Sequence, residues 1–82
     1  MSKRYIRVKV DRGVFPGERT ASFSAGGRSY SLIVDNGDIE NDKLAVLVLG
    51  EQGDDVLVAL PRETFTTGSR LRVPKAILEP VG

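Results

Sequence analysis

Residues 43–60 have the sequence KLAVLVLGEQGDDVLVAL, in which two apolar runs flank a polar turn that contains two glycines. Both runs, 43–49 and 56–60, are short and rich in Val and Leu, which is typical of β-strands. The turn at 50–55 between them predicts a β-hairpin. Because the runs are almost continuously apolar, we expect central strands that are covered on both faces. Pro61 should end the second strand, because proline has no N–H for the hydrogen-bond ladder.

Alternating patterns on either side of this hairpin predict further strands. Residues 5–10 alternate apolar with basic side chains, and residues 70–73 do so again. Residues 19–24 and 28–35 flank Gly26-Gly27, a glycine pair that suits a tight hairpin turn. Side chains that alternate in this way lie on opposite faces of a strand, so each of these segments should bury one face.

The spacing of these signals predicts the fold class. Turn residues recur every eight to twelve positions and no segment has the period of a long helix, which is typical of small sandwiches and barrels. We therefore expect an all-β, single-domain protein over residues 1–82, with five or six short antiparallel strands. Closing the sheet into a small barrel would cover its bare face and its edges.

The segment 68–78, GSRLRVPKAIL, resembles the closing segment of SH3-type barrels. In that family a glycine precedes a short strand, Val-Pro then opens a 3₁₀ turn, and an apolar residue leads into the last strand. The resemblance implies an SH3-like barrel in preference to an OB-like barrel or a sandwich. The chain lacks the aromatic ALYDY-like stretch near the start and the tryptophan pair of that family. Polyproline recognition, which needs those aromatic side chains, is therefore not implied.

The residue types that are missing exclude several kinds of chemistry. The 82 residues include no cysteine and no histidine, which removes thiolate and imidazole metal ligands, cysteine nucleophiles and histidine bases. The nine glycines match neither a P-loop nor a dinucleotide-binding fingerprint. We expect no enzymatic activity and no cofactor. The basic start is not followed by a continuous apolar stretch, so we expect a cytoplasmic protein without a membrane partner.

The net charge of +1 conceals a strong separation of charge along the chain. Residues 1–34 carry seven basic and two acidic side chains, whereas residues 35–55 carry one basic and seven acidic ones. Residues 56–82 carry four basic and two acidic side chains. Patches of opposite sign steer and orient partners more than they add affinity.

One hypothesis for the basic patch is single-stranded nucleic-acid binding. If the first strand pairs with residues 70–73, then Arg7 and Lys9 would lie beside Arg70 and Arg72, with Tyr5 available to stack on a base. Basic grooves with aromatic platforms bind single strands in this way. The alternative is that these cations form only the solvated face of half-buried strands.

A more remote hypothesis is a carboxylate metal site in the acidic loop. Asp38, Glu40 and Asp42 stand at alternate positions, as in calcium-binding loops. The EF-hand template fails, because the positions that require glycine and glutamate hold Lys43 and Leu49. A looser site and a plainly solvated turn are the two remaining interpretations.

Two phenylalanines in predicted loops suggest a contact with a protein partner. Phe15 lies between turn residues, and Phe65 lies in a hydroxyl-rich segment. Each side chain either plugs an open end of the barrel or anchors a partner. The sequence as a whole favours a non-enzymatic protein-interaction domain or small accessory subunit, with Phe15 and Phe65 as the partner-binding residues. The partner is unidentified, and both a monomer and a homodimer joined along an edge strand fit the pattern.

Overall fold

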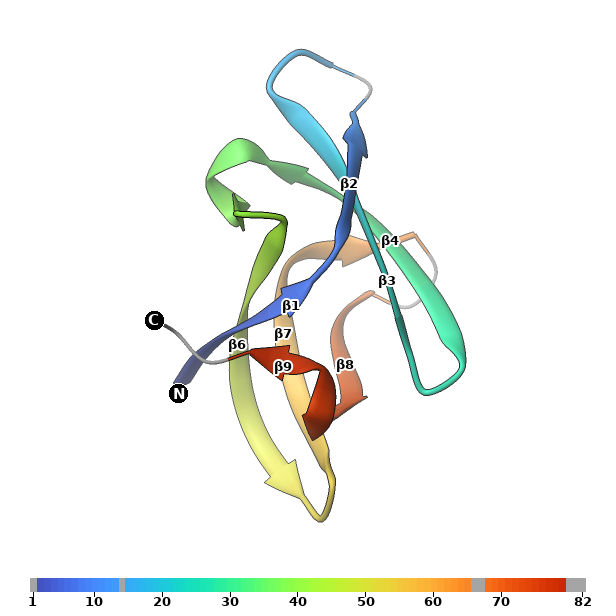
Figure 1. The fold of residues 1–82 in the computed structure, drawn as a ribbon, viewed down its shortest axis with the longest axis vertical. Coiled ribbons are helices and arrows are strands. Elements are labelled where there is room, and N and C mark those ends of the chain that lie inside the picture. The colour runs from blue at the N-terminus through green and yellow to red at the C-terminus, as the bar shows by residue number, and fades with distance from the viewer. Residues whose placement is uncertain (1, 14, 66–67, 80–82) are drawn as a thin grey trace.

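The computed structural model describes residues 2–13, 15–65 and 68–79, and most of these residues belong to β-strands. The all-β prediction is confirmed, but these residues form nine strands instead of five or six (Figure 1). None of the helical segments among them has the length and apolar character needed to span a bilayer. The strands are β1 (Ser2–Arg7), β2 (Lys9–Arg12), β3 (Glu18–Ala25), β4 (Arg28–Asp35), β5 (Ile39–Glu40), β6 (Lys43–Gln52), β7 (Asp55–Thr64), β8 (Gly68–Pro74) and β9 (Leu78–Glu79), with 3₁₀ turns η1 (Asn36–Asp38) and η2 (Lys75–Ile77).

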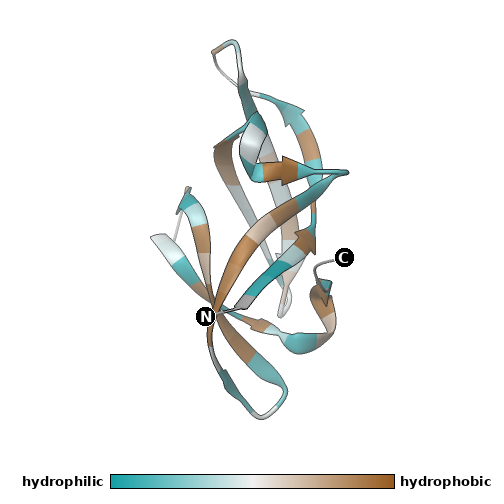
Figure 2. Ribbon diagram, turned by 90° about the vertical axis from the view of Figure 1, so that its left-hand side faces the viewer, coloured by the Kyte–Doolittle hydropathy of each residue, from teal (hydrophilic) through white to brown (hydrophobic). Residues whose placement is uncertain are grey.

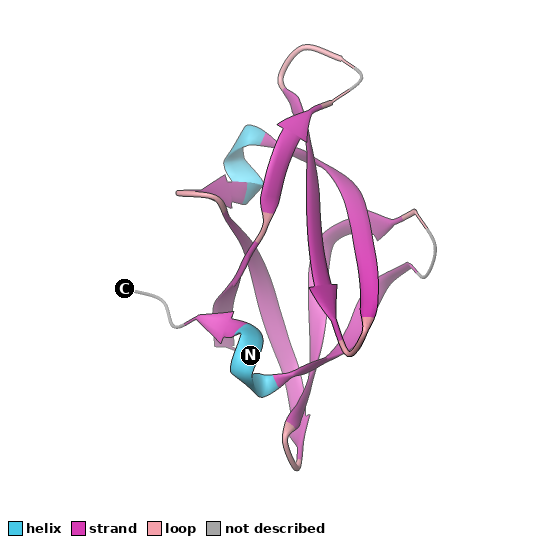
Figure 3. Cartoon of the chain, turned by 45° about the vertical axis from the view of Figure 1, so that its right-hand side comes forward, coloured by secondary structure: helices cyan, strands magenta, loops and turns pink. Residues whose placement is uncertain are grey.

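All strand pairs are antiparallel and belong to a single sheet that curls into a half-barrel (Figures 1 and 3). The strand order is β2-β3-β4-β7-β6-β1-β9, with β8 added to β7 and β5 added to β6. Strands β1 and β2 are consecutive pieces of chain separated by Val8, yet they pair with β6 and β3, respectively. The chain therefore passes from one part of the sheet to another at Val8. The Val8 N–H donates to the carbonyl oxygen of Asp42 at 2.9 Å and holds this junction in place.

The β3–β4 hairpin forms as the glycine pair predicts. Gly26 and Gly27 have φ angles of +57° and +80°, a backbone conformation that glycine adopts without steric cost. The register runs from Ala25 opposite Arg28 to Glu18 opposite Asp35 without interruption. The turn chemistry therefore sets the pairing of the whole hairpin.

The β6–β7 hairpin also forms, but only one of its faces is covered. Val46, Val56 and Val58 point into the core and are at most 2% exposed. Leu47 and Leu57, on the opposite face, are 43% and 39% exposed. The prediction of strands covered on both faces is therefore wrong. A chain of this size supplies one core, and the described residues place no second layer over these leucines.

The prediction that Pro61 ends its strand is also wrong, because β7 continues through it to Thr64. The regular pairs of β7 with β6 and β8 stop at Ala59, and the β7–β8 register is irregular between Ala59 and Thr64. Proline is tolerated at such irregularities, where a missing N–H removes no ladder hydrogen bond. Beyond this point β7 pairs with β4, through Leu32 opposite Thr64.

The end of the chain confirms the predicted 3₁₀ turn. Pro74 precedes η2, and the following strand β9 pairs with β1 through Ile6 opposite Leu78. Ile77 and Leu78 are partly buried against the core, which closes this side of the sheet.

The core occupies the concave side of the sheet, and in Figure 2 the apolar segments lie along the strands while polar segments gather at most turns. The Phe23 and Tyr30 rings, opposite each other on β3 and β4, lie 5.4 Å apart. Buried side-chain nitrogens and oxygens in the described part of the chain all have a hydrogen-bond partner. The core consists of Ile6, Val8, Ala21, Phe23, Ala25, Leu32, Val34, Leu44, Val46, Val56, Val58, Leu60, Leu71 and Val73.

A pair of neighbouring substitutions on β4 tests this one-sided core. Leu32 is 0% exposed, whereas the adjacent Ile33 is half-buried on the other face. Leu32→Ala should lower the free energy of unfolding by about 2–5 kcal/mol, because it removes buried methyl groups and leaves a cavity. Ile33→Ala, the matched control, should cost clearly less in the same urea titration. Equal losses for the two variants would contradict the one-sided core.

Candidate functional site

Phe15 lies on the turn between β2 and β3 and is 67% exposed. The turn is held by Glu18: the Gly13 N–H donates to the Glu18 carbonyl at 3.1 Å, and the Glu18 N–H donates to the Phe15 carbonyl at 3.1 Å. The Phe15 N–H also donates to Glu18 Oε1 at 3.2 Å. These bonds fix the backbone that carries Phe15, so the ring is displayed to solvent. This exposure excludes the alternative in which the ring plugs an open end of the barrel.

Gly13 is required by the tightness of this turn. A Cβ atom at residue 13 would lie 2.5 Å from Glu18 Cβ and 2.7 Å from the Glu18 carbonyl carbon. A larger residue would therefore push the two strands apart. A hollow of about 340 Å³ lies beside the turn, lined by Arg12, Gly13, Phe15, Pro16, Glu18 and Arg19.

Phe65 follows the last residue of β7 and is 64% exposed. Its N–H donates to the Ser31 carbonyl at 3.0 Å, and the neighbouring Thr64 hydroxyl donates to the Gly68 carbonyl at 2.9 Å. The ring of Phe65 is therefore also exposed to solvent, on a backbone that is held by hydrogen bonds, and it does not plug the barrel. The turn between β2 and β3 and the end of β7 lie well apart (Figure 1), so the two phenylalanines do not form one continuous patch.

The structure does not assemble the predicted basic patch. Strand β1 pairs with β6 and β9, while β8 pairs with β7. Two strands, β6 and β7, therefore separate Arg7 from Arg70 and Arg72. Lys9 lies on β2, at the far end of the strand order. The expected pairing of the first strand with residues 70–73 is wrong, because β9, which follows the 3₁₀ turn η2, pairs with β1 in their place.

Tyr5 and Arg7 are engaged within the protein. Tyr5 is only 9% exposed, and its hydroxyl donates to Glu40 Oε2 at 3.2 Å. Lys3 Nζ lies 5.5 Å from the centre of the Tyr5 ring. Arg7 Nε donates to Glu79 Oε2 at 3.1 Å. The ring is therefore poorly placed to stack on a base.

Glu79 forms a small ionic cluster that the sequence does not reveal. Its carboxylate lies 3.1 Å from Arg7 Nε and 2.8 Å from Lys43 Nζ. The hydrogen bond from Lys43 lowers the pKa of Glu79, with the charge of Arg7 acting in the same direction and partial removal from water opposing both. The cluster joins β9 to β1 and β6. No spacing pattern in the sequence relates residue 79 to residues 7 and 43. The cluster can therefore be recognised only when the pairing of the strands is known.

The acidic loop does not gather its carboxylates around a common point. Asp38 accepts a hydrogen bond from the Asp35 N–H at 3.1 Å, and Arg62 Nη2 lies 2.6 Å from Asp35 Oδ2. Glu40 accepts from the tyrosine hydroxyl described above, and Asp42 is exposed with a φ of +61°. Among residues 2–13, 15–65 and 68–79, no group of three acidic side chains is placed to hold a metal ion.

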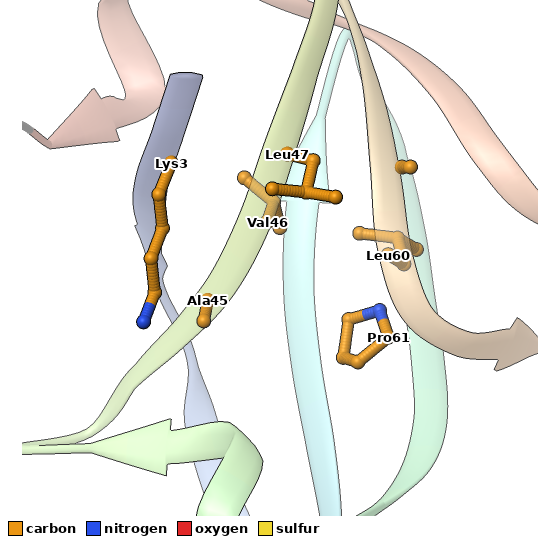
Figure 4. Close-up of a pocket in the computed structure, with 7 residues that line it drawn as sticks. Lys3, Ala45, Val46, Leu47, Leu60 and Pro61 are labelled. Atoms are coloured by element: carbon orange, nitrogen blue, oxygen red, sulfur yellow. The ribbon is translucent and has the colours of Figure 1, made fainter. Parts of the chain in front are cut away.

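Sequence reasoning missed an apolar surface on the convex side of β6 and β7. We define the outer face as Ala45, Leu47, Leu57, Ala59 and Pro61. A hollow of about 170 Å³ lies between the two strands, where their regular pairing ends. In Figure 4 the Lys3 side chain lies beside Ala45 on one side of β6, and Pro61 lies on β7 at the other side. The hollow is lined by Lys3, Ala45, Val46, Leu47, Ala59, Leu60 and Pro61.

Comparisons of the chain with models of known protein families, with curated proteins and with solved structures find no match. The exposed surfaces of the fold are therefore the features that bear on its function.

The ionic cluster at Glu79 predicts a pH-dependent contribution to stability. Because the pKa of Glu79 is lowered in the folded state, its contribution is present above the unfolded-state pKa and is lost as the pH falls through the folded-state pKa. Glu79→Gln should therefore lower the melting temperature at neutral pH and have little effect in strong acid. Glu63→Gln, at an exposed glutamate on β7, is the matched control and should behave like the parent chain. A Glu79→Gln effect of equal size at both pH values would contradict this role.

Proposed function

We propose that this chain is a non-enzymatic protein-interaction module, a small domain or accessory subunit that contacts its partner through Phe15 and Phe65. The observation that carries the proposal is that these residues are 67% and 64% exposed, in a chain that has only three phenylalanines. Burying one such ring against a partner is worth about 1.5–3 kcal/mol. Large aromatic side chains are also the usual anchors of protein interfaces.

The geometry around Phe15 supports binding by a preformed surface. The three hydrogen bonds between the turn and Glu18 hold the backbone before any partner arrives, which reduces the entropy lost on binding. Arg12 and Arg19 face each other across β2 and β3, directly below the turn. An aromatic ring beside arginines has the composition of an interface hot spot.

The separation of charge gives the module a way to orient its partner. The Phe15 turn lies in the basic first third of the chain, whereas the β6–β7 hairpin carries Glu51, Asp54 and Asp55 at and beside its turn. A partner with complementary charges would be steered into one orientation.

The finer architecture that we propose is an SH3-like half-barrel. Its support is the end of the chain: Gly68, with a φ of +81°, opens β8, and η2 follows Val73-Pro74. The last strand, β9, then returns to pair with β1. The resemblance to SH3-type barrels rests on this order of glycine, short strand, 3₁₀ turn and final strand.

Single-stranded nucleic-acid binding is less well supported. The strand order separates Arg7 from Arg70 and Arg72, and Tyr5 is covered by the protein itself. We therefore treat it as a competing outcome of the experiment below.

Replacing the exposed phenylalanines should abolish partner capture without unfolding the protein. Phe15→Ala and Phe65→Ala should each change the free energy of unfolding by no more than about 0.5 kcal/mol, because neither ring is packed. Phe23→Ala, at a ring that is 8% exposed, is the control and should cost about 3–5 kcal/mol. Capture of protein from the native cell extract by the immobilised chain should be lost in the double variant.

Unfolding of the Phe15→Ala/Phe65→Ala chain would show that the rings are structural and would contradict the proposal. Binding of short RNA or DNA oligonucleotides at low salt, weakening steeply as salt rises, would favour the competing hypothesis instead. Fluorescence anisotropy with labelled oligonucleotides measures this directly.

A further inference from the structure

We propose that the outer face binds an extended acidic segment of another protein, with an apolar side chain of the segment in the hollow between β6 and β7. The carboxylates of the segment would lie against Lys3 on one side and Arg70 on the other. This surface is separate from Phe15 and Phe65, so the inference does not rest on their role.

A row of paired residues across four strands carries this inference. Lys3 on β1 is opposite Leu47 on β6, Leu47 is opposite Ala59 on β7, and Ala59 is opposite Arg70 on β8. Residues that face each other in adjacent strands project their side chains from the same face of the sheet. The row therefore has a cation at each end and apolar side chains in the middle. The backbone positions at its two ends are three strand spacings apart, or about 14 Å.

The arginines of β8 are available to a ligand. Arg70 and Arg72 are exposed, and within the described ranges no carboxylate lies at ion-pairing distance from either of them. Arg7 and Arg62, by contrast, are paired with Glu79 and Asp35. Exposed arginines beside apolar surface can bind carboxylates in a bidentate manner.

The end of the outer face at Leu57 determines whether the ligand runs across the strands or along them. Leu57 lies opposite Arg72 on one side and Gly50 on the other, and the glycine leaves the leucine uncovered. A second hollow, of about 180 Å³, lies here and is also lined by Glu51 and Asp55. Glu51 is paired with Lys75, whose Nζ lies 3.0 Å from Glu51 Oε1, but among the described residues no cation pairs with Asp55, so Asp55 repels an acidic ligand. The segment is therefore directed across the strands, from Lys3 to Arg70, instead of along them toward the β6–β7 turn.

The spacing of the row defines the chemistry of the segment. An extended chain advances about 3.3 Å per residue, so carboxylates four positions apart are separated by about 13 Å, which matches the row. The residue midway between them would place its side chain over the hollow beside Leu47 and Ala59. A single-stranded nucleic acid fits less well, because it needs exposed aromatic side chains for stacking, and Tyr5, which is opposite Ala45 on the same face, is only 9% exposed.

The test uses the full chain and one synthetic probe. The probe is a fluorescein-labelled, five-residue peptide with glutamate at its first and fifth positions, leucine at its third and serine at its second and fourth. Titration into ¹⁵N-labelled protein should shift the amide signals of Leu47, Ala59 and Arg70. In anisotropy measurements, Arg70→Glu should weaken binding about tenfold or more, because it places like charges together.

Matched controls separate the two contributions to binding. Arg28→Glu makes the same charge change at the β3–β4 turn, away from the outer face, and should leave the affinity unchanged. A peptide with glutamine in place of both glutamates should bind more weakly, and so should one with serine in place of leucine.

Four results would overturn the proposal, and the first three are no amide shifts with the probe, shifts confined to the surroundings of Phe15 and Phe65, and displacement of the probe by an oligonucleotide. A fourth would be a dimer in sedimentation experiments that Leu47→Asp dissociates, because the occupant of the outer face would then be a second copy of the chain. The phenylalanine variants are measured separately, so failure here leaves the proposed function standing.

Discussion

Strand β7 is hydrogen-bonded to three other strands, and the curvature of the entire sheet depends on this. Its first half pairs with β6 and β8, and its last residue, Thr64, pairs with Leu32 of β4. Between these two regions the regular ladder is interrupted at Pro61, where the strand can change direction without losing a hydrogen bond. The same interruption lets β4 and its hairpin fold over the concave side and bury the core. It also opens the hollow between β6 and β7 on the convex side.

The sequence predicts those parts of the fold that depend on local backbone chemistry. Gly26-Gly27 sets one hairpin and Val73-Pro74 precedes the 3₁₀ turn, because each places a conformational requirement on adjacent residues. The partners of β1 and the passage of β7 through Pro61 depend on residues far apart in the chain, so a local pattern cannot reveal them. The exposure of Leu47 could not be predicted for a similar reason. The hydropathy of a run does not show whether a second layer exists to cover it.

The candidate binding surfaces were likewise predictable from the sequence only in part. The sequence places Phe15 in a turn, but only the bonds to Glu18 show that the ring is displayed and not packed. The charge separation is visible in the sequence, whereas the arrangement of cations is not, since strand order decides which of them are neighbours. Arg70 loses its expected neighbour Arg7 and instead lies at the end of a row that begins at Lys3. The molecule thus presents aromatic rings at two turns and an apolar strip between cations on its convex side.

The central claim is that strands β6 and β7 are covered on one face and open on the other. Methyl relaxation by a soluble gadolinium chelate tests it most directly, because the chelate broadens only the methyl signals that it can approach. The account predicts strong broadening for Leu47 and Leu57 and protection for Val46 and Val58, their neighbours on the opposite face of the same strands. Equal protection of all four residues in the isolated chain would contradict it.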